Sequence, residues 1–455
     1  MNINHHTNGH KPPPPPSSSN FTLSASTRTS GMGASVFSEF TQLAISTQSV
    51  NLGQGFPDFT VDPYITDILV DVAKNQQSNQ YTRSIGHIPL CNAIATHYNK
   101  YNPVYPIDSM KNVLVTCGAT EAMYTTLQAL LNKGDEVIIF QPFYDAYVAQ
   151  IEIAGGVVRY ATLDNSRLDD PYIDTDSNKP YYSAQDYTFD INELKSLINN
   201  KTKAIIINTP HNPLGKIFTR AELQQISDLI QPYPHIVCIS DDVYEHLIYD
   251  DSTPLVRMRD VCPERTVTFG SAGKTYSITG WKIGWIIGPE QLIHTISLIH
   301  QWVPFCVSTP LQQAVAEIIT QSESNGFFDK LKNQMKSKHD RLFNGLLLAN
   351  LSPIKSNAGY FIVVANTSNV YHNTQHDIAA YENSNGSDKS IQKPDFVFAK
   401  WLTRTIGLTP IPVSAFMNNK SWKECSSMSR FAFCKKDESI DEAIKRLGTL
   451  QTLEQ

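Results

Sequence analysis

Small and polar side chains follow five short apolar runs of the sequence, at the points where these runs end. The segments are Gly118 to Thr120, Gln141 to Tyr144, Asn208 to Pro213, Ser240 to Tyr244 and Ser271 to Lys274. The apolar runs alternate with amphipathic stretches, which is the pattern of βα units that build a parallel sheet. Ligands of such sheets bind beyond the carboxyl ends of the strands. We therefore expect the five segments to meet at one edge and to form a site there.

The groups expected at this edge could bind three different parts of one molecule. Free amides at the start of a helix near Ala119 favour a phosphate, and the Thr120 hydroxyl adds a donor. An aspartate such as Asp241 keeps a ring nitrogen protonated, and a lysine such as Lys274 holds an aldehyde as a Schiff base. Phosphate, ring nitrogen and aldehyde occur together in pyridoxal phosphate. The residues therefore predict this cofactor.

Longer motifs carry a family resemblance that extends from about residue 30 to the C-terminus in unbroken order. They are Asn51 to Phe59 (NLGQGFPDF), Asn208 to Lys216 (NTPHNPLGK), Ser240 to His246 (SDDVYEH) and Ser271 to Trp285 (SAGKTYSITGWKIGW). The chain resembles class I, fold type I aminotransferases, and within them the group of kynurenine/glutamine aminotransferases and bacterial methionine aminotransferases. The resemblance implies an α/β fold with a large, mostly parallel-sheet domain and a smaller discontinuous α+β domain.

The resemblance also implies roles around the ring of pyridoxal 5'-phosphate. Lys274 would form the Schiff base and later move the proton between the substrate's α carbon and the cofactor. Asp241 would pair with the pyridinium nitrogen, while Asn212 and Tyr244 would hydrogen-bond the phenolic oxygen. Tyr144 would stack on the ring face.

A second set of implied contacts concerns the phosphate and a neighbouring subunit. Ala119 and Thr120, through their backbone amides, would hold the phosphate together with Ser271 and Lys282. Tyr81 matches a tyrosine that reaches the neighbouring subunit's cofactor in the family. The resemblance thus implies a homodimer with shared active sites.

The substrate is expected to bind through its carboxylate. Arg430 matches the arginine that grips the α-carboxylate, and its planar guanidinium suits a bidentate contact. Asn212 and the backbone of Gly55 would assist. Aromatic side chains would surround the substrate's own side chain and favour aromatic groups or the sulfur of methionine: Phe37, Tyr81, Tyr144, Trp302 and Phe305. Cys306 stands where some kynurenine-processing relatives carry a histidine, which argues against kynurenine itself.

Each residue also has a plainer interpretation. Lys216 and Lys282 compete with Lys274 for the Schiff base, and Asp241 alone could be a helix cap or the partner of a salt bridge. We expect its neighbour Asp242 to face solvent. Arg430 alone could be a charge on a strand edge, and Phe37 and Trp302 could equally belong to the core.

The predicted activity is an aminotransferase that moves the α-amino group of methionine-like or aromatic amino acids to a 2-oxo acid by a ping-pong mechanism. The alternative is a kynurenine/glutamine aminotransferase that also cleaves cysteine conjugates by β-elimination. A serine acyl-enzyme, suggested by S-x-x-K at Ser271 to Lys274, lacks its companion motifs. A regulator built on the same fold would need a DNA-binding module, for which residues 1–30 are too short and too weakly basic.

Composition limits the class of protein and its partners. The chain has 455 residues, with 37 Lys and Arg against 43 Asp and Glu, a net charge of −6. No basic stripe or apolar run of membrane length is present, so small amino acids and 2-oxo acids are expected as partners, not nucleic acid or membrane. Seven scattered cysteines suit free, mostly buried thiols in the cytoplasm. No metal site is expected.

The predicted organisation has three parts. Residues 1–30 read as a disordered tail, residues 31–65 plus 325–455 as the small domain, and residues 66–324 as the large cofactor-binding domain. Polar stretches at 164–187 and 371–395 read as surface insertions. Apolar runs predict strands at 112–116, 136–140, 204–208, 236–240, 266–270, 282–288, 360–364 and 429–433. Helices are predicted at 119–131, 220–229, 396–405 and from about 440, and Thr219 with Glu222 forms a capping-box pattern before the second of these.

Overall fold

The structure is a computed structural model that describes residues 24–29, 32–33, 35–165, 167–250, 252–365, 367 and 393–453. The chain divides into a unit of residues 1–33 and a unit of residues 34–455. In the first unit, the described residues include a single 3-10 turn, Thr27–Thr29. The tail predicted for residues 1–30 and the insertion predicted for 371–395 lie mostly outside the described residues. The division into a small and a large domain stays a prediction.

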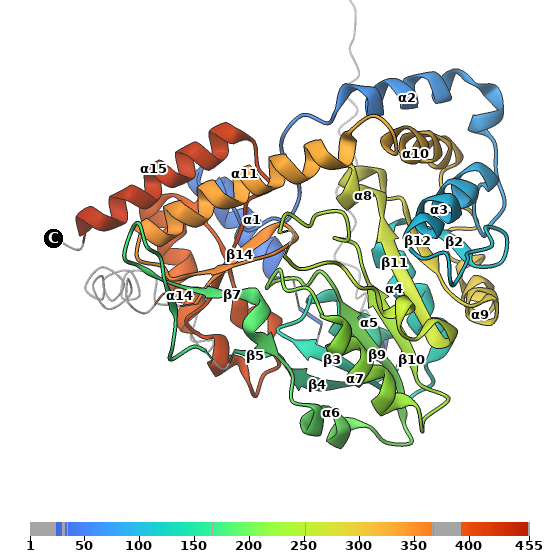
Figure 1. The fold of residues 1–455 in the computed structure, drawn as a ribbon, viewed down its shortest axis with the longest axis horizontal. Helices are drawn as coiled ribbons and strands as arrows, with labels where there is room; N and C mark the ends of the chain where they lie inside the picture. The colour runs from blue at the N-terminus through green and yellow to red at the C-terminus, as the bar shows by residue number, and fades with distance from the viewer. Residues whose placement is uncertain are drawn as a thin grey trace, which may run out of the picture. The chain divides into compact units, whose positions relative to one another are not determined.

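A seven-stranded sheet forms the centre of the second unit (Figure 1). Its strand order is β2-β12-β11-β10-β9-β3-β4, and every neighbouring pair is parallel except those of β12, which runs antiparallel to β11 and β2. The strands are β2 (Val113–Thr116), β3 (Glu136–Gln141), β4 (Val157–Thr162), β9 (Thr202–Asn208), β10 (Val237–Asp241), β11 (Thr266–Ser271) and β12 (Gly284–Ile287). The predicted mostly parallel sheet is confirmed.

The inner strands of this sheet are apolar because both of their faces are covered. Strand β9, for example, is buried along nearly its whole length, and so are β3 and β11. Edge strand β4 alternates between exposed and half-buried positions over most of its length. Its weaker apolar character explains why the sequence predicts the other six strands but not this one.

Helices pack around the sheet, and those at the β2 and β12 end are seen together in Figure 1. The helices of this part are α2 (Pro63–Lys74), α3 (Ile88–Tyr101), α4 (Gly118–Leu130), α5 (Ala146–Ile153), α6 (Ile191–Leu197), α7 (Arg220–Ile230), α8 (Ala272–Thr275), α9 (Glu290–His300) and α10 (Thr309–Ser322). The predicted capping box is present at α7: the Thr219 hydroxyl accepts from the Glu222 amide (3.2 Å), and the Glu222 carboxylate accepts from the Thr219 amide (2.7 Å). The chain therefore enters α7 where the motif predicts.

A second sheet has six strands in the order β16-β17-β14-β13-β7-β6. They are β6 (Tyr172–Ile173), β7 (Pro180–Ser183), β13 (Pro353–Lys355), β14 (Phe361–Val364), β16 (Ile411–Pro412) and β17 (Ser429–Ala432). The predicted strands at 360–364 and 429–433 are β14 and β17. Segment 164–187, predicted to be a surface insertion, instead supplies β6 and β7, and β7 pairs in parallel with β13. The prediction holds for exposed positions such as Asp169 and Ile173, but not for Tyr182 and Tyr187, whose side chains are buried in the core.

Helices α11 (Phe327–Leu348) and α15 (Asp437–Leu453) pack against each other beside this second sheet (Figure 1). Helix α15 begins three residues before the predicted position. The predicted helix at 396–405 is α14 (Pro394–Trp401), which continues as a π-helical turn, Leu402–Ile406. The remaining elements of this part are α1 (Val36–Thr47), the pair β1 (Val50–Asn51) and β15 (Leu408–Thr409), and the pair β5 (Asp164–Asn165) and β8 (Tyr187–Thr188).

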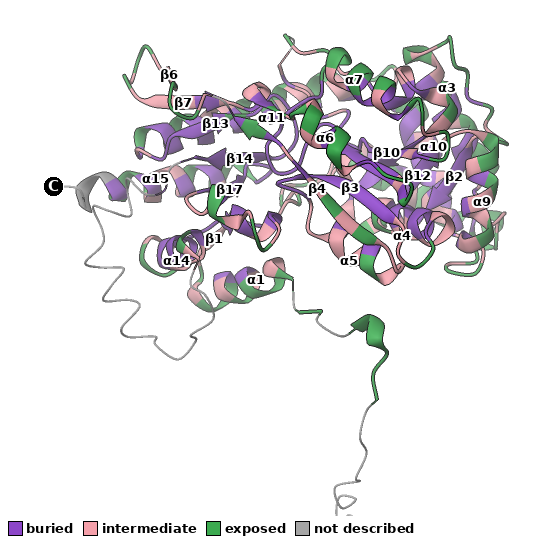
Figure 2. Ribbon diagram, turned by 90° about the horizontal axis from the view of Figure 1, so that it is seen from below, coloured by how far each residue is buried: buried purple, intermediate pink, exposed green. Residues whose placement is uncertain are grey.

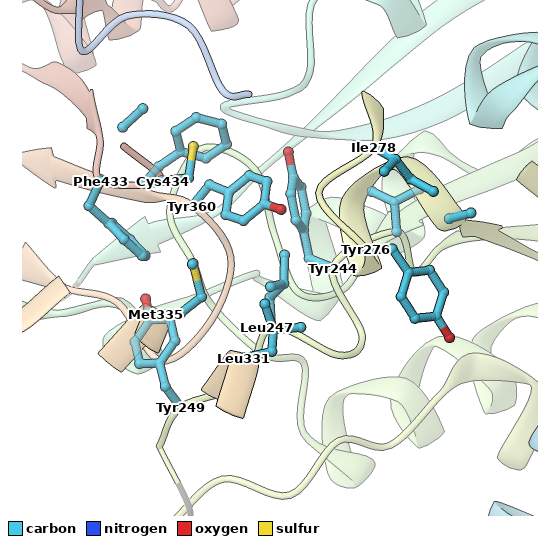
Figure 3. Packing of buried hydrophobic residues seen from close by; sticks show 14 of the residues in the cluster. Tyr244, Leu247, Tyr249, Tyr276, Ile278, Leu331, Met335, Tyr360, Phe433 and Cys434 are labelled. Carbon is cyan, nitrogen blue, oxygen red and sulfur yellow. The ribbon is translucent and has the colours of Figure 1, made fainter. Parts of the chain in front are cut away.

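Burial concentrates on the strands and on the inward faces of the helices (Figure 2). Figure 3 shows one part of the core, where Tyr360 lies between Tyr244 on one side and Phe433 and Cys434 on the other. All seven cysteines are free; five of them are buried and Cys117 and Cys306 are half-buried, as predicted. Among the described residues, no helix is both long and apolar enough to cross a membrane.

Candidate active site

A cavity of about 410 Å³ lies where the carboxyl ends of the central strands were predicted to gather their polar residues. Its size is within the range of small-molecule sites. It is lined by every predicted site residue except Tyr81, Trp302 and Phe305, namely by Phe37, Gly55, Ala119, Thr120, Tyr144, Asn212, Asp241, Tyr244, Ser271, Lys274, Lys282 and Arg430. The fold therefore brings together residues that are up to 393 positions apart in the chain, from Phe37 to Arg430.

Three aromatic residues predicted for the substrate or for the neighbouring subunit lie outside the cavity of this chain. Tyr81 is 85% exposed and Trp302 is 84% exposed. Phe305 is also exposed and meets the ring of Tyr81 edge-on, at 5.3 Å between centroids. Their predicted roles stay predictions.

Asp241 ends strand β10 and is buried at the floor of the cavity. Its Oδ2 accepts a hydrogen bond from the Tyr147 hydroxyl (2.5 Å), while its Oδ1 is buried and has no partner among the described residues. Burial raises the pKa of the Asp241 carboxyl, while the Tyr147 hydrogen bond, the Val243 backbone amide and the charge of Lys274 oppose that shift. An unpaired, buried carboxylate oxygen is a fitting partner for a cationic ring N–H.

Lys274 lies in the short helix α8, directly after β11. Its Nζ donates to the Gly55 carbonyl (2.8 Å), and the Tyr360 hydroxyl fixes the backbone by donating to the Lys274 carbonyl (2.7 Å). Burial lowers the pKa of this amine to about 8. The amine therefore loses its proton closer to neutral pH than an ordinary lysine does, and the uncharged form is the one that attacks an aldehyde.

The surroundings of the two competing lysines distinguish them from Lys274. Lys216 is buried outside the cavity, in an ion pair with Glu222 (2.9 Å). Lys282 lines the cavity, but its Nζ lies over the start of α4, where an anion is expected. Lys274 combines a position in the cavity with an amine pKa that burial lowers to about 8.

The first turn of α4 and the chain before β12 form a tight cradle. Gly118 begins α4 with φ +73°, and Lys282 has a left-handed φ of 55°. A Cβ placed on Gly118 would lie 3.3 Å from Lys282 Nζ, which puts that amine over the helix start. A Cβ on Gly284 would lie 2.8 Å from the Ala119 amide nitrogen, so only glycine lets the two segments approach this closely. Helix amides and an amine converge here, as a phosphate requires.

Arg430 lies on β17 and is 1% exposed. Strand β17 is paired on both sides, with β14 and β16, so Arg430 is not a strand-edge charge. Its Nη1 donates to Asn212 Oδ1 (2.9 Å) and its Nη2 to the Gly53 carbonyl (2.8 Å), while Nε is buried without a partner among the described residues. Burial lowers the pKa of this guanidinium to about 10, which leaves it charged at neutral pH.

Aromatic rings enclose the Arg430 guanidinium. Its central carbon lies 3.9 Å from the ring centroid of Phe361, 4.9 Å from that of Phe416 and 5.1 Å from that of Phe37. These rings exclude water and strengthen the attraction of the cation for a carboxylate. Asn212 uses its side-chain oxygen for Arg430, so its NH₂ group is the donor that remains for a ligand.

Asp242 does not face solvent as predicted, because its side chain is fully buried. Its Oδ1 accepts from the Ser240 hydroxyl (2.5 Å), and burial raises the pKa of its carboxyl well above the usual range. Asp242 follows the last residue of β10, but its side chain also points inward, because its backbone amide donates to the Phe269 carbonyl of β11 (3.1 Å).

Several residues of the site were missed by the sequence analysis. Tyr147 and Gln150 follow Tyr144 at intervals of three residues, a spacing that could have placed them on the same helix face. No sequence pattern marked Phe361 and Phe416 as site residues, because isolated aromatic residues in apolar runs usually belong to the hydrophobic core. Gly53 is part of the NLGQGFPDF motif, but the hydrogen bond that its carbonyl accepts from Arg430 is known only from the fold.

The fold and the site together define a class of enzyme. A mostly parallel sheet presents at one edge an amine with a lowered pKa, a carboxylate with an unpaired oxygen and an anion cradle. These groups match, in turn, the aldehyde, the ring nitrogen and the phosphate of pyridoxal phosphate, so the residues fit this cofactor.

Comparison with known proteins agrees with this class. Residues 47–447 match the family described as aminotransferase class I and II, and the chain belongs to this family. It is 39% identical over 426 residues to human kynurenine–oxoglutarate transaminase 3, covering 91% of this chain and 88% of the relative. It is a pyridoxal-phosphate-dependent aminotransferase of the group that contains kynurenine and methionine aminotransferases.

Solved structures give the same result. A protein of Saccharomyces cerevisiae described as a candidate kynurenine aminotransferase superposes with a TM-score of 0.86 at 30% identity, over 95% of this chain and 100% of that one. The Escherichia coli protein YbdL, for which a methionine aminotransferase function is described, superposes with a TM-score of 0.78 at 30% identity, over 94% of this chain and 100% of that one.

Proposed function

We propose that this aminotransferase takes the amino group from large aromatic amino acids, with kynurenine as the leading donor and 2-oxoglutarate as the acceptor. The observation that supports it is the cavity wall, where Phe37 and Tyr144 stand beside the buried Arg430. An aromatic substrate side chain gains most from such a wall. The name of the human relative supports the same donor and acceptor.

Each site residue has a distinct part in the proposed reaction. Pyridoxal phosphate, when bound, supplies the aldehyde that takes up the amino group and a ring that withdraws electrons from the α carbon. Arg430 holds the substrate carboxylate with its planar fork, and Asn212 assists. Lys274 Nζ accepts the proton from the α carbon and returns it at the next step. Asp241, whose Oδ1 has no partner among the described residues, would pair with the ring nitrogen, and the hydroxyl of Tyr244 would hydrogen-bond the phenolic oxygen.

Methionine is the competing donor. The family resemblance places Cys306, which is half-buried, where some kynurenine-processing aminotransferases carry a histidine, and a solved relative has a described methionine aminotransferase function. The purified protein, loaded with pyridoxal phosphate, should be assayed with kynurenine, phenylalanine, methionine and glutamine against 2-oxoglutarate. The proposal expects the highest kcat/KM for kynurenine. A higher kcat/KM for methionine would replace kynurenine as the donor, and no product from any of the four would refute the proposal.

β-Elimination on cysteine conjugates is a second activity that the same groups support, because loss of the α proton precedes both reactions. Incubation of the enzyme with a cysteine S-conjugate should then release pyruvate without any added 2-oxo acid. Lys274→Ala serves as the control, since it lacks the group that moves the proton. Pyruvate that appears only when an acceptor is present would exclude the lyase activity.

We also propose a homodimer in the cytoplasm. Tyr81 and Phe305, whose rings meet edge-on, and Trp302, three residues before Phe305, are exposed aromatic side chains suited to burial against a second copy. Light scattering should give twice the chain mass, and a monomer with full activity would refute shared sites. Seven unpaired cysteines fit a reducing compartment. A fluorescent fusion of the full chain that concentrates in an organelle would exclude the cytoplasm.

A further inference from the structure

Helix α5 presents three residues to the cavity on one face. Tyr144, just before the helix, and Tyr147 and Gln150 within it are spaced by three residues, and all of them line the cavity. The Gln150 amide donates to the Thr120 carbonyl in the first turn of α4 (3.2 Å). The helix therefore contacts the anion cradle at one end of the site and Asp241 at the other.

Tyr147 makes the contact with Asp241. Its side chain is buried, and its hydroxyl donates to Asp241 Oδ2. Burial raises the pKa of the Tyr147 phenol well above the usual range, so the phenol keeps its proton and acts as a donor. Its ring also meets the ring of Tyr144 edge-on, with centroids 5.5 Å apart and planes at 86°. One residue thus contacts both the predicted partner of the ring nitrogen and the predicted stacking residue.

The hydrogen bond decides which carboxylate oxygen is free. The terminal torsion of an aspartate is broad, so a carboxylate with no fixed partner can rotate in its pocket. With Oδ2 held by Tyr147, Oδ1 is left as the buried atom without a partner. Burial raises the pKa of Asp241, and the Tyr147 bond is the largest of three effects that oppose this, ahead of the Val243 amide and the charge of Lys274. The other titratable groups that interact with Asp241 are Asp242, Tyr144 and Tyr244. Without the phenol, the carboxyl would bind its proton at a higher pH than in the wild type.

We propose that Tyr147 is a positioning residue that aims Asp241 Oδ1 at the ring nitrogen of the cofactor and keeps Asp241 in its charged form. This inference concerns cofactor binding and does not depend on which amino acid is the donor. A failure of the proposed substrate assignment would therefore leave it unchanged.

The test is the affinity of the cofactor-free protein for pyridoxal phosphate, measured across pH for Tyr147→Phe and the wild type. The variant keeps the ring and loses only the hydroxyl. We expect its Kd to rise by about tenfold to a hundredfold, the loss typical of one hydrogen bond to a charged group. Because the Asp241 carboxyl takes up its proton at a higher pH, the pH below which affinity is lost should also move upward. An unchanged Kd together with an unchanged pH midpoint would overturn the proposal.

Tyr249→Phe is the matched control. Tyr249 is equally buried and hydrogen-bonded, to Ser356 (2.8 Å) and the Ala358 carbonyl (3.2 Å), but it does not line the cavity. It should lose stability without a change in the Kd or the pH midpoint; equal shifts in both variants would indicate a structural effect and refute the proposal.

A second variant keeps the proposal testable if Tyr147→Phe does not fold. Replacement of Tyr147 by 3-fluorotyrosine preserves the ring and its packing, and it makes the phenol a stronger donor. The pH midpoint of cofactor binding should then move downward, opposite to the shift of Tyr147→Phe. A midpoint that stays in place would refute the role of the hydroxyl.

Discussion

Arg430→Lys tests whether the planar fork of Arg430 binds the substrate carboxylate. In the wild type, Nη1 and Nη2 are already aligned by Asn212 and the Gly53 carbonyl, at 2.9 and 2.8 Å. A lysine keeps the positive charge, but its single ammonium cannot satisfy both protein acceptors and a two-oxygen ligand at the same time. The substitution therefore removes at least one charge-assisted hydrogen bond to the carboxylate while filling most of the same volume.

The size of the expected fall in kcat/KM follows from the loss of that hydrogen bond. One hydrogen bond to a charged group contributes about 1.5–3 kcal/mol, and each 1.4 kcal/mol corresponds to a tenfold change in affinity. We expect kcat/KM to fall by about tenfold to 150-fold, mainly through KM. The factor should be nearly the same for kynurenine, phenylalanine and methionine, because they share the α-carboxylate and differ only in their side chains.

Steady-state kinetics on the three donors, with cofactor saturation checked by absorbance, measures this effect. Arg257→Lys is the matched control: Arg257 is also buried and binds Glu245 through two nitrogens (2.7 and 2.8 Å), but it does not line the cavity. That variant should lose stability with little change in KM. A KM for Arg430→Lys equal to that of the wild type, or a loss confined to one donor, would refute the assignment of Arg430 to the carboxylate.

Three further predictions concern the amine and the fold. Lys274→Ala should abolish transamination while the protein still folds, as judged by product assay and circular dichroism; retained turnover would remove Lys274 from catalysis. Burial lowers the pKa of the Lys274 amine to about 8, so covalent attachment of pyridoxal phosphate, trapped with borohydride and followed by mass spectrometry, should speed up as the pH rises toward 8 and level off above it. A rate that keeps rising to the pH of an ordinary lysine would contradict the effect of burial. Thr219→Ala removes the cap of α7 and should lower the free energy of unfolding by about 1 kcal/mol in denaturant titrations; Thr219→Ser, which keeps the hydroxyl, should lose much less, and equal losses would argue against the cap.

The sequence predicted most of the central sheet because parallel strands that are covered on both faces must be apolar. The same logic fails at β4, an edge strand with exposed positions. It also fails for β6 and β7: these short strands pair with each other as a hairpin, and β7 joins the second sheet by pairing with β13, far along the chain, which local patterns do not reveal. Register and pairing in the second sheet depend on contacts between segments far apart in the chain.

The site was predictable where a reactive residue type at a strand end also stands within a long family motif, as for Lys274 and Asp241. It was not predictable where the contact comes from a different part of the fold. The direction in which Asp242 points depends on packing against β11, not on the local sequence. The Gly53 carbonyl and the ring of Phe361 contact Arg430 because the fold brings them close to it, and no sequence motif indicates these contacts.

The reversed direction of β12 makes one short segment sensitive to changes in length. A parallel neighbour would need a long crossover, but an antiparallel strand can return directly, and only residues 272–283 separate β11 from β12. Lys274 and Lys282 both lie on this return and face the same cavity. Insertion of one residue between them would displace one amine relative to the other and shift Gly284 from its close approach to Ala119. Changes of length in this segment should therefore be tolerated far less than substitutions within it.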